Sequence, residues 1–144
     1  MSGPGSAWPS RVAVVGAGTM GVGISHVFAS SGIPTALVDA TPELSEAARE
    51  RAVDLLSRLE QAGNVGRGTA AIAEQHLSAA PSIADAVRGA DLVVEAVAER
   101  PDVKLAVYAE IEPAAGDDAV IATNTSSIPI AELGAGLLNG SFCS

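Results

Sequence analysis

The sequence predicts an α/β fold with a doubly wound parallel sheet, in which helices cover both faces of the strands. Short runs rich in β-branched residues alternate with longer helical patterns, which is typical of parallel strands joined by right-handed crossovers. Glycines directly follow the first of these runs, where a strand gives way to a helix. The chain has 144 residues, of which 48% are hydrophobic and 17% charged, so it fits one domain whose sheet is buried on both faces.

The first half of the chain contains two expected strands and a helix between them. Residues Arg11–Val15 form an apolar run that ends at a glycine, and Thr35–Val38 form a second run that ends at Asp39. Between them, Met20–Ser31 has the pattern of a helix that stops at Gly32.

A long insertion separates the second expected strand from the third. Thr41 is a favoured N-cap residue and Pro42 a favoured first helical residue, so a helix should begin here and end at Gly63–Asn64. Its apolar positions keep helical spacing and predict one buried face: Leu44, Ala48, Ala52, Leu55, Leu59 and Ala62. With a weaker helix over Ala70–His76, the insertion exceeds what one crossover helix requires, so we expect a helical insertion between strands two and three.

The second half continues the alternation. The expected strands are Leu77–Ala80, Asp91–Glu95 and Ala119–Thr123. The expected helices are Ser82–Val87, Pro101–Glu112 and Pro129–Leu138. Residues 1–10, which contain Gly, Pro and Ser, are expected to be a flexible leader.

Composition excludes several classes of function. A net charge of −9 argues against a nucleic-acid partner, which requires a basic face. The single cysteine, Cys143, excludes a disulfide framework, and two histidines far apart, His26 and His76, do not suggest a metal site. No apolar run reaches the roughly 18–20 residues of a membrane helix, so we expect a soluble, cytoplasmic protein without a membrane partner.

The glycine-rich turn has the pattern G-x-G-x-x-G and consists of Gly16, Ala17, Gly18, Thr19, Met20 and Gly21. The first glycine permits a tight turn, the second lets the backbone approach a diphosphate, and the third lets the helix pack close to the strand. The N-terminus of the following helix offers N–H groups and a positive dipole end to an anion. The pattern therefore predicts a dinucleotide site, although such a turn can also serve packing alone.

An acidic residue follows at the expected distance. Asp39 lies eighteen residues after Gly21, at the end of the second expected strand. A carboxylate there can accept hydrogen bonds from the adenosine ribose hydroxyls and would repel a 2′-phosphate. No arginine stands among the next residues, Ala40, Thr41 and Pro42, so NAD is favoured over NADP. A flavin protein with the same turn and acid is the alternative.

Three further stretches carry a resemblance to a known family. They are Glu95–Glu99 in the run L-V-V-E-A-V-A-E, Lys104, and Asn124–Ser127 in the run N-T-S-S. Together with the glycine turn and Asp39, they resemble the N-terminal NAD-binding domain of the 3-hydroxyacyl-CoA dehydrogenase family, from about Arg11 to Leu133. The resemblance implies a Rossmann-type NAD-binding domain, here expected over residues 11–137, with a non-matching tail over residues 138–144.

The resemblance also implies roles for individual residues. Met20 and Lys104 match cofactor contacts, and Asp39 matches the ribose-binding acid. The stretch that lines the nicotinamide half corresponds to Val97, Ala98 and Glu99. Ser126 matches the active-site serine that holds the reacting oxygen of the substrate and touches the cofactor, and Asn124 belongs to the same loop. From the residues alone, Lys104 would form a solvated pair with a glutamate, and the Asn124–Ser127 loop would be an ordinary capping loop.

The implied reaction converts a (3S)-3-hydroxyacyl-CoA and NAD into a 3-oxoacyl-CoA and NADH, as in fatty-acid metabolism. The partner is then an acyl-CoA thioester, and a full-length form is expected to be a homodimer. The catalytic histidine of the family would fall just past Ser144, so the sequence resembles a truncated form. A non-catalytic NAD-binding fragment and a related β-hydroxyacid or sugar-acid dehydrogenase remain the alternatives. Four arginines of the insertion fit either coenzyme A phosphates or solvated ion pairs: Arg49, Arg51, Arg58 and Arg67.

Overall fold

A computed structural model describes residues 9–97, 101–123 and 142–143. Its centre is a six-stranded sheet with the order β3-β2-β1-β4-β5-β6, and every pairing is parallel. The strands are β1 (Val12–Val15), β2 (Thr35–Val38), β3 (Leu77–Ala79), β4 (Leu92–Glu95), β5 (Val120–Thr123) and β6 (Phe142–Cys143). The first strand lies in the middle, so strand order reverses beside it, and ligands bind at such a switch point in open α/β sheets.

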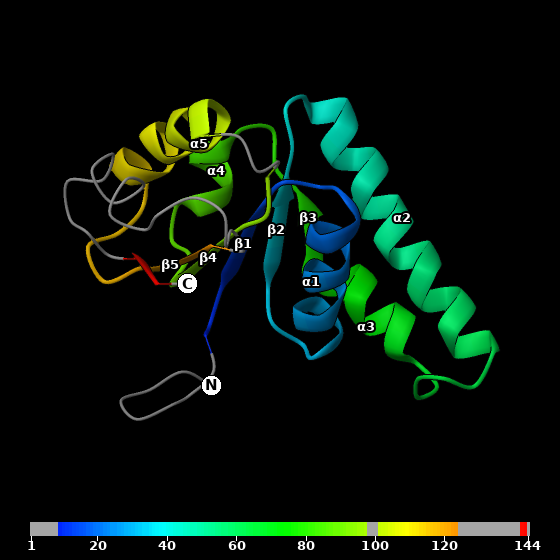
Figure 1. Cartoon of the computed structure of the whole chain (residues 1–144). Helices are drawn as coiled ribbons and strands as arrows, with labels where there is room; N and C mark the ends of the chain where they lie inside the picture. Colours follow the sequence, from blue (N-terminus) through cyan, green and yellow to red (C-terminus); the bar gives the residue numbers. More distant parts are fainter. Residues whose placement is uncertain (1–8, 98–100, 124–141, 144) are drawn as a thin grey trace.

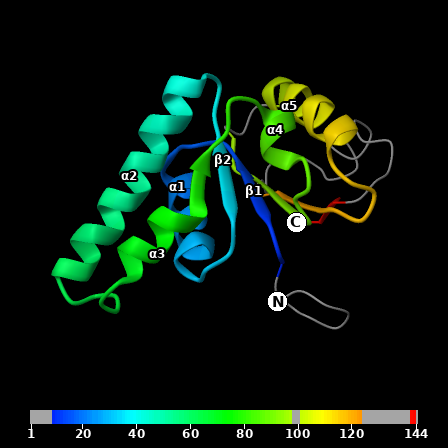
Figure 2. The ribbon, with the colours of Figure 1, turned by 180° about the vertical axis from the view of Figure 1, so that it is seen from behind.

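Helices cover both faces of this sheet (Figure 1). On one face lie α1 (Thr19–Ser30), α2 (Pro42–Gln61) and α3 (Thr69–His76), which pack against one another. On the other lie α4 (Ile83–Val87) and α5 (Pro101–Ala114), and the view from behind in Figure 2 shows the same separation. This is the predicted doubly wound architecture.

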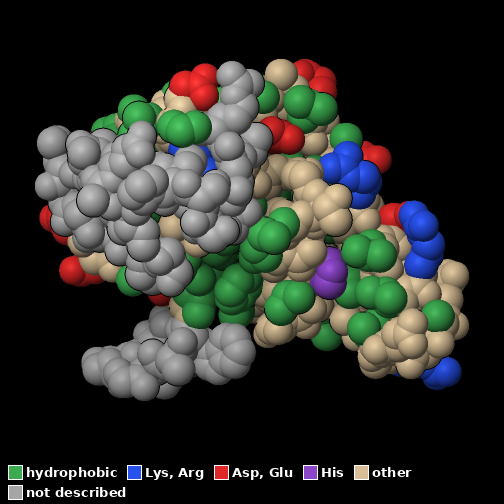
Figure 3. Space-filling view, in the orientation of Figure 1, with side chains coloured by type: hydrophobic (Ala, Val, Ile, Leu, Met, Phe, Trp, Pro, Cys, Tyr) green, Lys and Arg blue, Asp and Glu red, His purple; other side chains and the backbone are tan. Residues whose placement is uncertain are grey.

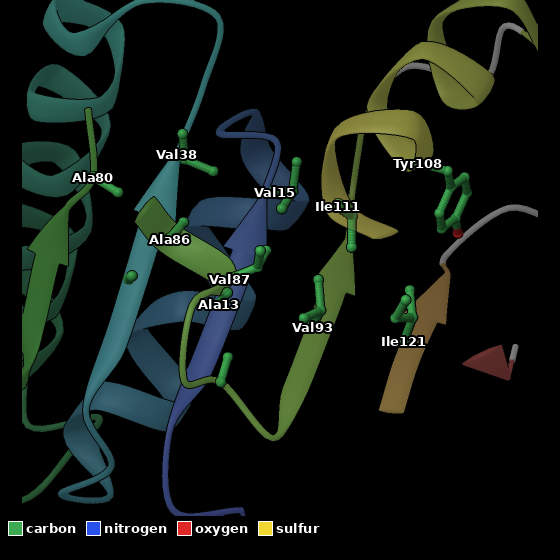
Figure 4. Packing of buried hydrophobic residues seen from close by; sticks show 12 residues of the cluster. Ala13, Val15, Val38, Ala80, Ala86, Val87, Val93, Tyr108, Ile111 and Ile121 are labelled. Atoms are coloured by element: carbon green, nitrogen blue, oxygen red, sulfur yellow. The ribbon is translucent and has the colours of Figure 1, made fainter. Parts of the chain in front are cut away.

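Alternation along the strands divides the core in two. Val12 and Val14 of β1 pack with α1 and α2, whereas Ala13 and Val15 pack with α4 and α5. Figure 4 shows the second cluster, in which Tyr108 of α5 joins the aliphatic side chains of the strands. Successive side chains of a strand point to opposite faces, so a sheet covered on both sides buries them all. All four residues of β1 are buried, as are all four of β2.

The helical insertion between β2 and β3 is confirmed as a pair, α2 and α3. The Thr41 hydroxyl caps α2 by accepting the Leu44 N–H at 3.1 Å, as predicted. The predicted buried face is right at Ala48 and Ala52, only partly right at half-buried Leu59, and wrong at Leu44, Leu55 and Ala62, which are exposed. The helix instead buries a stripe at intervals of three or four residues, which consists of Ser45, Ala48, Ala52 and Leu56.

The ends of the chain add two features. Asp91 accepts hydrogen bonds from the N–H and hydroxyl of Ser10 and from the Arg11 N–H, at 2.9–3.0 Å, which anchors the approach to β1. The strand β6, which no pattern in the sequence predicts, pairs with β5 at Ile121 and Ala122. The helix expected over Pro129–Leu138 lies outside the described residues. Within the described part of the chain, no helix is both long and apolar enough to cross a membrane.

Candidate functional site

The glycine turn connects β1 to α1, and two of its glycines are required by close contacts. Gly16 has φ +110, and a Cβ placed on it would lie 2.6 Å from the carbonyl carbon and oxygen of Ala96. A Cβ on Gly21 would lie 1.8 Å from the Gly16 oxygen, so α1 begins packed against the turn. These contacts match the roles of the first and third glycines in a dinucleotide-binding turn.

The second glycine of the turn faces open space. A Cβ on Gly18 would meet nothing within 4 Å among the described residues. Gly18 is also the N-cap residue of α1, and it has no side chain with which to cap the helix. The turn therefore leaves room for a group that needs close approach to backbone N–H donors at a helix N-terminus, as a diphosphate does. The glycine turn and the N-terminus of α1 thus fit the NAD that the sequence predicts.

A pocket of about 640 Å³ lies beside this turn at the carboxyl ends of the strands. Its size falls in the usual range for ligand sites. Residues 15–20, 38–40 and 96–97 line it where β1, β2 and β4 end, and Ile83, Val103, Val107 and Glu110 line it from α4 and α5. Chain segments far apart in sequence thus meet at one edge of the sheet, as the parallel topology requires.

Asp39 lies in this pocket at the end of β2, and local bonds hold its backbone and side chain. Its carboxylate Oδ1 accepts the Ala40 N–H at 2.7 Å. Its own N–H donates to the Ser45 hydroxyl at 2.8 Å, and that hydroxyl donates to the Thr41 carbonyl. The first turn of α2 therefore fixes the position of Asp39 at the pocket, where a ribose could be bound.

A buried polar network lies behind the pocket, centred on Glu95. The Lys104 Nζ lies 2.6 and 2.8 Å from the two carboxylate oxygens of Glu95, and both side chains are fully buried. The Thr123 hydroxyl donates to Glu95 Oε1 at 2.5 Å, and the Val97 N–H donates to Oε2 at 2.7 Å. The Tyr108 hydroxyl lies 3.5 Å from Oε1. The solvated pair expected for Lys104 from the residues alone is therefore wrong, because the pair is buried and its acid is Glu95.

Burial raises the pKa of Tyr108 to about 12. The Thr123 hydrogen bond lowers this pKa, while the charge of Glu95 and its hydrogen bond raise it. A phenol in this place stays protonated near neutral pH, so it acts as a neutral donor toward the Glu95 carboxylate. The sequence places Thr123 only at the end of an expected strand and gives Tyr108 no role, because no motif connects either residue with Glu95.

The structure brings together predicted residues of both halves of the cofactor site. Residues 16–20 of the turn, Asp39 and Val97 all line the pocket, whereas Gly21 packs against the backbone of Gly16. Met20 is 54% exposed and also borders an apolar groove of about 460 Å³ on α1, where Figure 3 shows hydrophobic side chains. Four predicted site residues lie outside the described residues: Ala98, Glu99, Asn124 and Ser126.

The arginines of the helical insertion differ in the contacts that they make. Arg58 pairs with Asp54 on the exposed side of α2, and Arg49 donates to the carbonyls of Glu74 and Leu77, so Arg49 joins α2 to α3 and β3. Arg51 donates to the carbonyl of Ala17 in the glycine turn at 2.8 Å.

The two histidines and the acidic groups give no metal site in the described part of the chain. Burial lowers the pKa of His26, whose Nδ1 is buried and has no hydrogen-bond partner there. His76 Nδ1 lies 2.8 Å from the Ile72 carbonyl oxygen of its own helix, α3. Neither histidine lines the pocket beside the glycine turn.

Comparison with known proteins agrees with this geometry. The model of the 3-hydroxyacyl-CoA dehydrogenase NAD-binding domain matches residues 11–141. A probable 3-hydroxyacyl-CoA dehydrogenase of Caenorhabditis elegans is 33% identical over 133 residues, which are 89% of this chain and 43% of that protein. The α subunit of the fatty acid oxidation complex of Idiomarina loihiensis is 38% identical over 125 residues, 83% of this chain and 17% of that protein.

A solved structure shows the same fold. The (S)-3-hydroxybutyryl-CoA dehydrogenase of Ralstonia eutropha superposes with a TM-score of 0.85 at 30% identity, covering 94% of this chain and 48% of that one. The chain thus spans less than half the length of each of these three proteins. The family match covers most of the chain, including the turn, Asp39 and the Glu95 network. The chain therefore belongs to the 3-hydroxyacyl-CoA dehydrogenase family, and NAD is the cofactor of the domain that it matches.

Proposed function

We propose that this chain forms the cofactor-binding part of an NAD-dependent 3-hydroxyacyl-CoA dehydrogenase. The observation that carries the proposal is the meeting of the glycine turn, Asp39 and the loop after β4 in one pocket. The turn and the N-terminus of α1 would hold the diphosphate, and Asp39 would hold the adenosine ribose. The nicotinamide half would lie toward Val97, with Ala98 and Glu99 as further contacts. Lys104, which is fully buried against Glu95, would support this half from the interior.

The reaction proposed is oxidation of a (3S)-3-hydroxyacyl-CoA to the 3-oxoacyl-CoA, with NAD as the hydride acceptor. Ser126 is the proposed catalytic residue that holds the substrate oxygen, and Asn124 would orient the same loop. Their loop follows β5, whose last residue, Thr123, bonds to Glu95 beside the pocket. The position of Thr123 supports this assignment, because it is the last residue of β5 and bonds to the acid that precedes the pocket loop.

A base must also take the hydroxyl proton as the hydride leaves. His26 is a residue of α1, and the His76 ring lies against its own helix, α3. Neither histidine lines the pocket, so neither is placed to act as this base. We therefore expect these 144 residues to bind NAD weakly and to give no turnover alone. Steady-state oxidation of 3-hydroxybutyryl-CoA at an enzymatic rate by this chain would contradict that expectation.

The substrate class and the assembly are part of the proposal. An acyl-CoA thioester is the proposed partner, a homodimer the proposed state of a longer form, and the cytoplasm the proposed location. Thermal stabilisation of an NADH-loaded longer form by 3-oxoacyl-CoA, but not by free hydroxy acids, would support the thioester. The opposite preference would favour a β-hydroxyacid dehydrogenase.

The direct test of cofactor choice is a calorimetric titration of the chain with NAD and NADP. We expect binding of NAD and at least tenfold weaker binding of NADP, because the Asp39 carboxylate repels a 2′-phosphate. Asp39→Asn should weaken NAD and remove most of the discrimination. Asp54→Asn, the same change in an exposed pair on α2, is the matched control and should alter neither. An unchanged NAD-to-NADP ratio in Asp39→Asn would show that Asp39 does not read the ribose.

A further inference from the structure

The Glu95 carboxylate receives bonds from two neighbouring segments and from its own loop. They come from Lys104 on α5, Thr123 at the end of β5, and the Val97 N–H two residues further along the chain. Burying an ion pair is costly, and apolar side chains of similar volume often stabilise a fold as well or better. Stability alone therefore does not account for a fully buried Glu95–Lys104 pair at this place.

The position of the network relates it to the pocket. Glu95 and Thr123 are the last residues of β4 and β5, and they are register partners in the sheet. The loop after β4 is held by two backbone donors: the Ala96 N–H bonds to the Val15 carbonyl at 2.8 Å, and the Val97 N–H bonds to Glu95. In this position the Ala96 carbonyl closes against Gly16, and both loop residues line the pocket.

We propose that Glu95 is a positioning residue for the nicotinamide half of the site. Its carboxylate sets the path of Ala96 and Val97, the loop after β4, against Gly16 and ties that loop to the end of β5 through Thr123. Lys104 supplies the opposite charge in the interior. Glu95 acts through these groups and does not itself touch the cofactor. This inference rests on the proposed function as an NAD-dependent dehydrogenase.

The proposal separates the two halves of the cofactor. The glycine turn and Asp39 are held by hydrogen bonds that do not involve Glu95: the Gly16 N–H donates to the Val38 carbonyl, and Asp39 bonds to Ala40 and Ser45. Loss of the Glu95 bonds should therefore weaken contacts to the nicotinamide half and spare those to the ADP-ribose half. A role limited to stability would instead weaken NAD and ADP-ribose together, or neither.

The test compares the dissociation constants of NAD and ADP-ribose, measured by calorimetry on the full chain. The variants are Glu95→Gln, which removes the carboxylate charge, and Thr123→Val, which removes one donor and leaves the ion pair intact. We expect the preference for NAD over ADP-ribose to fall about tenfold in Glu95→Gln and less in Thr123→Val, and Thr123→Ser to restore it. The matched control is Glu60→Gln, because the Glu60 carboxylate also accepts a backbone N–H, that of Ala70, away from the pocket.

Melting curves identify variants that do not fold. If Glu95→Gln fails to fold, Thr123→Val decides the question. An unchanged NAD-to-ADP-ribose ratio in folded Glu95→Gln and Thr123→Val overturns the positioning role, even if both melt at lower temperature. A wild-type chain that binds neither ligand refutes the proposed function itself, and the inference falls with it.

Discussion

Replacement of Gly16 by alanine tests the close contact on which the pocket depends. The new Cβ would lie 2.6 Å from the Ala96 carbonyl and 2.9 Å from the Val97 nitrogen, and all of these are backbone atoms that cannot rotate away. The positive φ of Gly16 costs an alanine about 1–2 kcal/mol. Displacing a packed loop adds about 1–3 kcal/mol, by analogy with overpacked cores. The unfolding free energy should therefore fall by about 2–5 kcal/mol.

The assay is thermal unfolding followed by circular dichroism, with NAD affinity measured below the transition. A loss of this size should lower the melting midpoint by roughly 6–15 °C in a domain of this length. Gly18→Ala is the matched control for stability: its Cβ meets nothing within 4 Å among the described residues, so the unfolding free energy should change by less than about 1 kcal/mol. The same methyl should nevertheless weaken NAD, because it occupies the space needed by the diphosphate.

The two variants thus separate stability from binding: Gly16→Ala should lower stability, whereas Gly18→Ala should weaken NAD with little change in stability. Equal stability of Gly16→Ala and wild type would show that the loop after β4 yields easily and that the contact with Gly16 does not hold it. Unchanged NAD affinity in Gly18→Ala would show that the diphosphate does not bind at the glycine turn.

Two further predictions concern the interior. Lys104→Met should destabilise the fold by about 3–5 kcal/mol in denaturant unfolding, because it leaves the Glu95 charge buried without its partner. The double variant Glu95→Leu/Lys104→Met should recover much of that loss. A double variant that is no more stable than the single variant would contradict this reasoning. Tyr108 is the sole tyrosine, so an absorbance titration reports it directly and should show ionisation near pH 12. Since the folded chain holds this proton more tightly than an unfolded phenol with a pKa near 10, stability should fall as the pH rises from about 10 to 12. Ionisation of Tyr108 near pH 10 in the folded chain would count against its burial.

Much of the fold could be predicted because its determinants are local. The apolar runs, the glycines that end them and the pair Thr41–Pro42 are contiguous in the sequence, and each specifies a nearby structure. The buried face of α2 was predicted less well. Helical spacing gives a stripe, but the neighbours that cover it decide between Leu55, which is exposed, and Leu56, which is buried.

The candidate site likewise has a part that local sequence specifies and a part that depends on residues far apart in the chain. The residues of the turn and Asp39 were predicted because a diphosphate and a ribose need them at fixed spacing along one β-α-β unit. The partners of Glu95 could not be found by spacing: Thr123 lies 28 residues away and meets it only through the register of β4 and β5. Tyr108, 13 residues from Glu95, reaches it only because α5 folds back over that face of the sheet.

The difference between the two halves has a physical origin. The adenosine side is built from backbone N–H groups and an acid fixed by its own neighbours, so a short sequence specifies it wherever a strand meets a helix. The nicotinamide side takes its geometry from the Glu95 carboxylate, which accepts hydrogen bonds from three segments: the loop after β4, helix α5 and strand β5. A partly satisfied buried network is costly, so all of its members must be in place for the loop after β4 to keep one position. The loop after β4 thus acquires its position only when β4, β5 and α5 have come together, whereas Asp39 is held by residues within six positions of it.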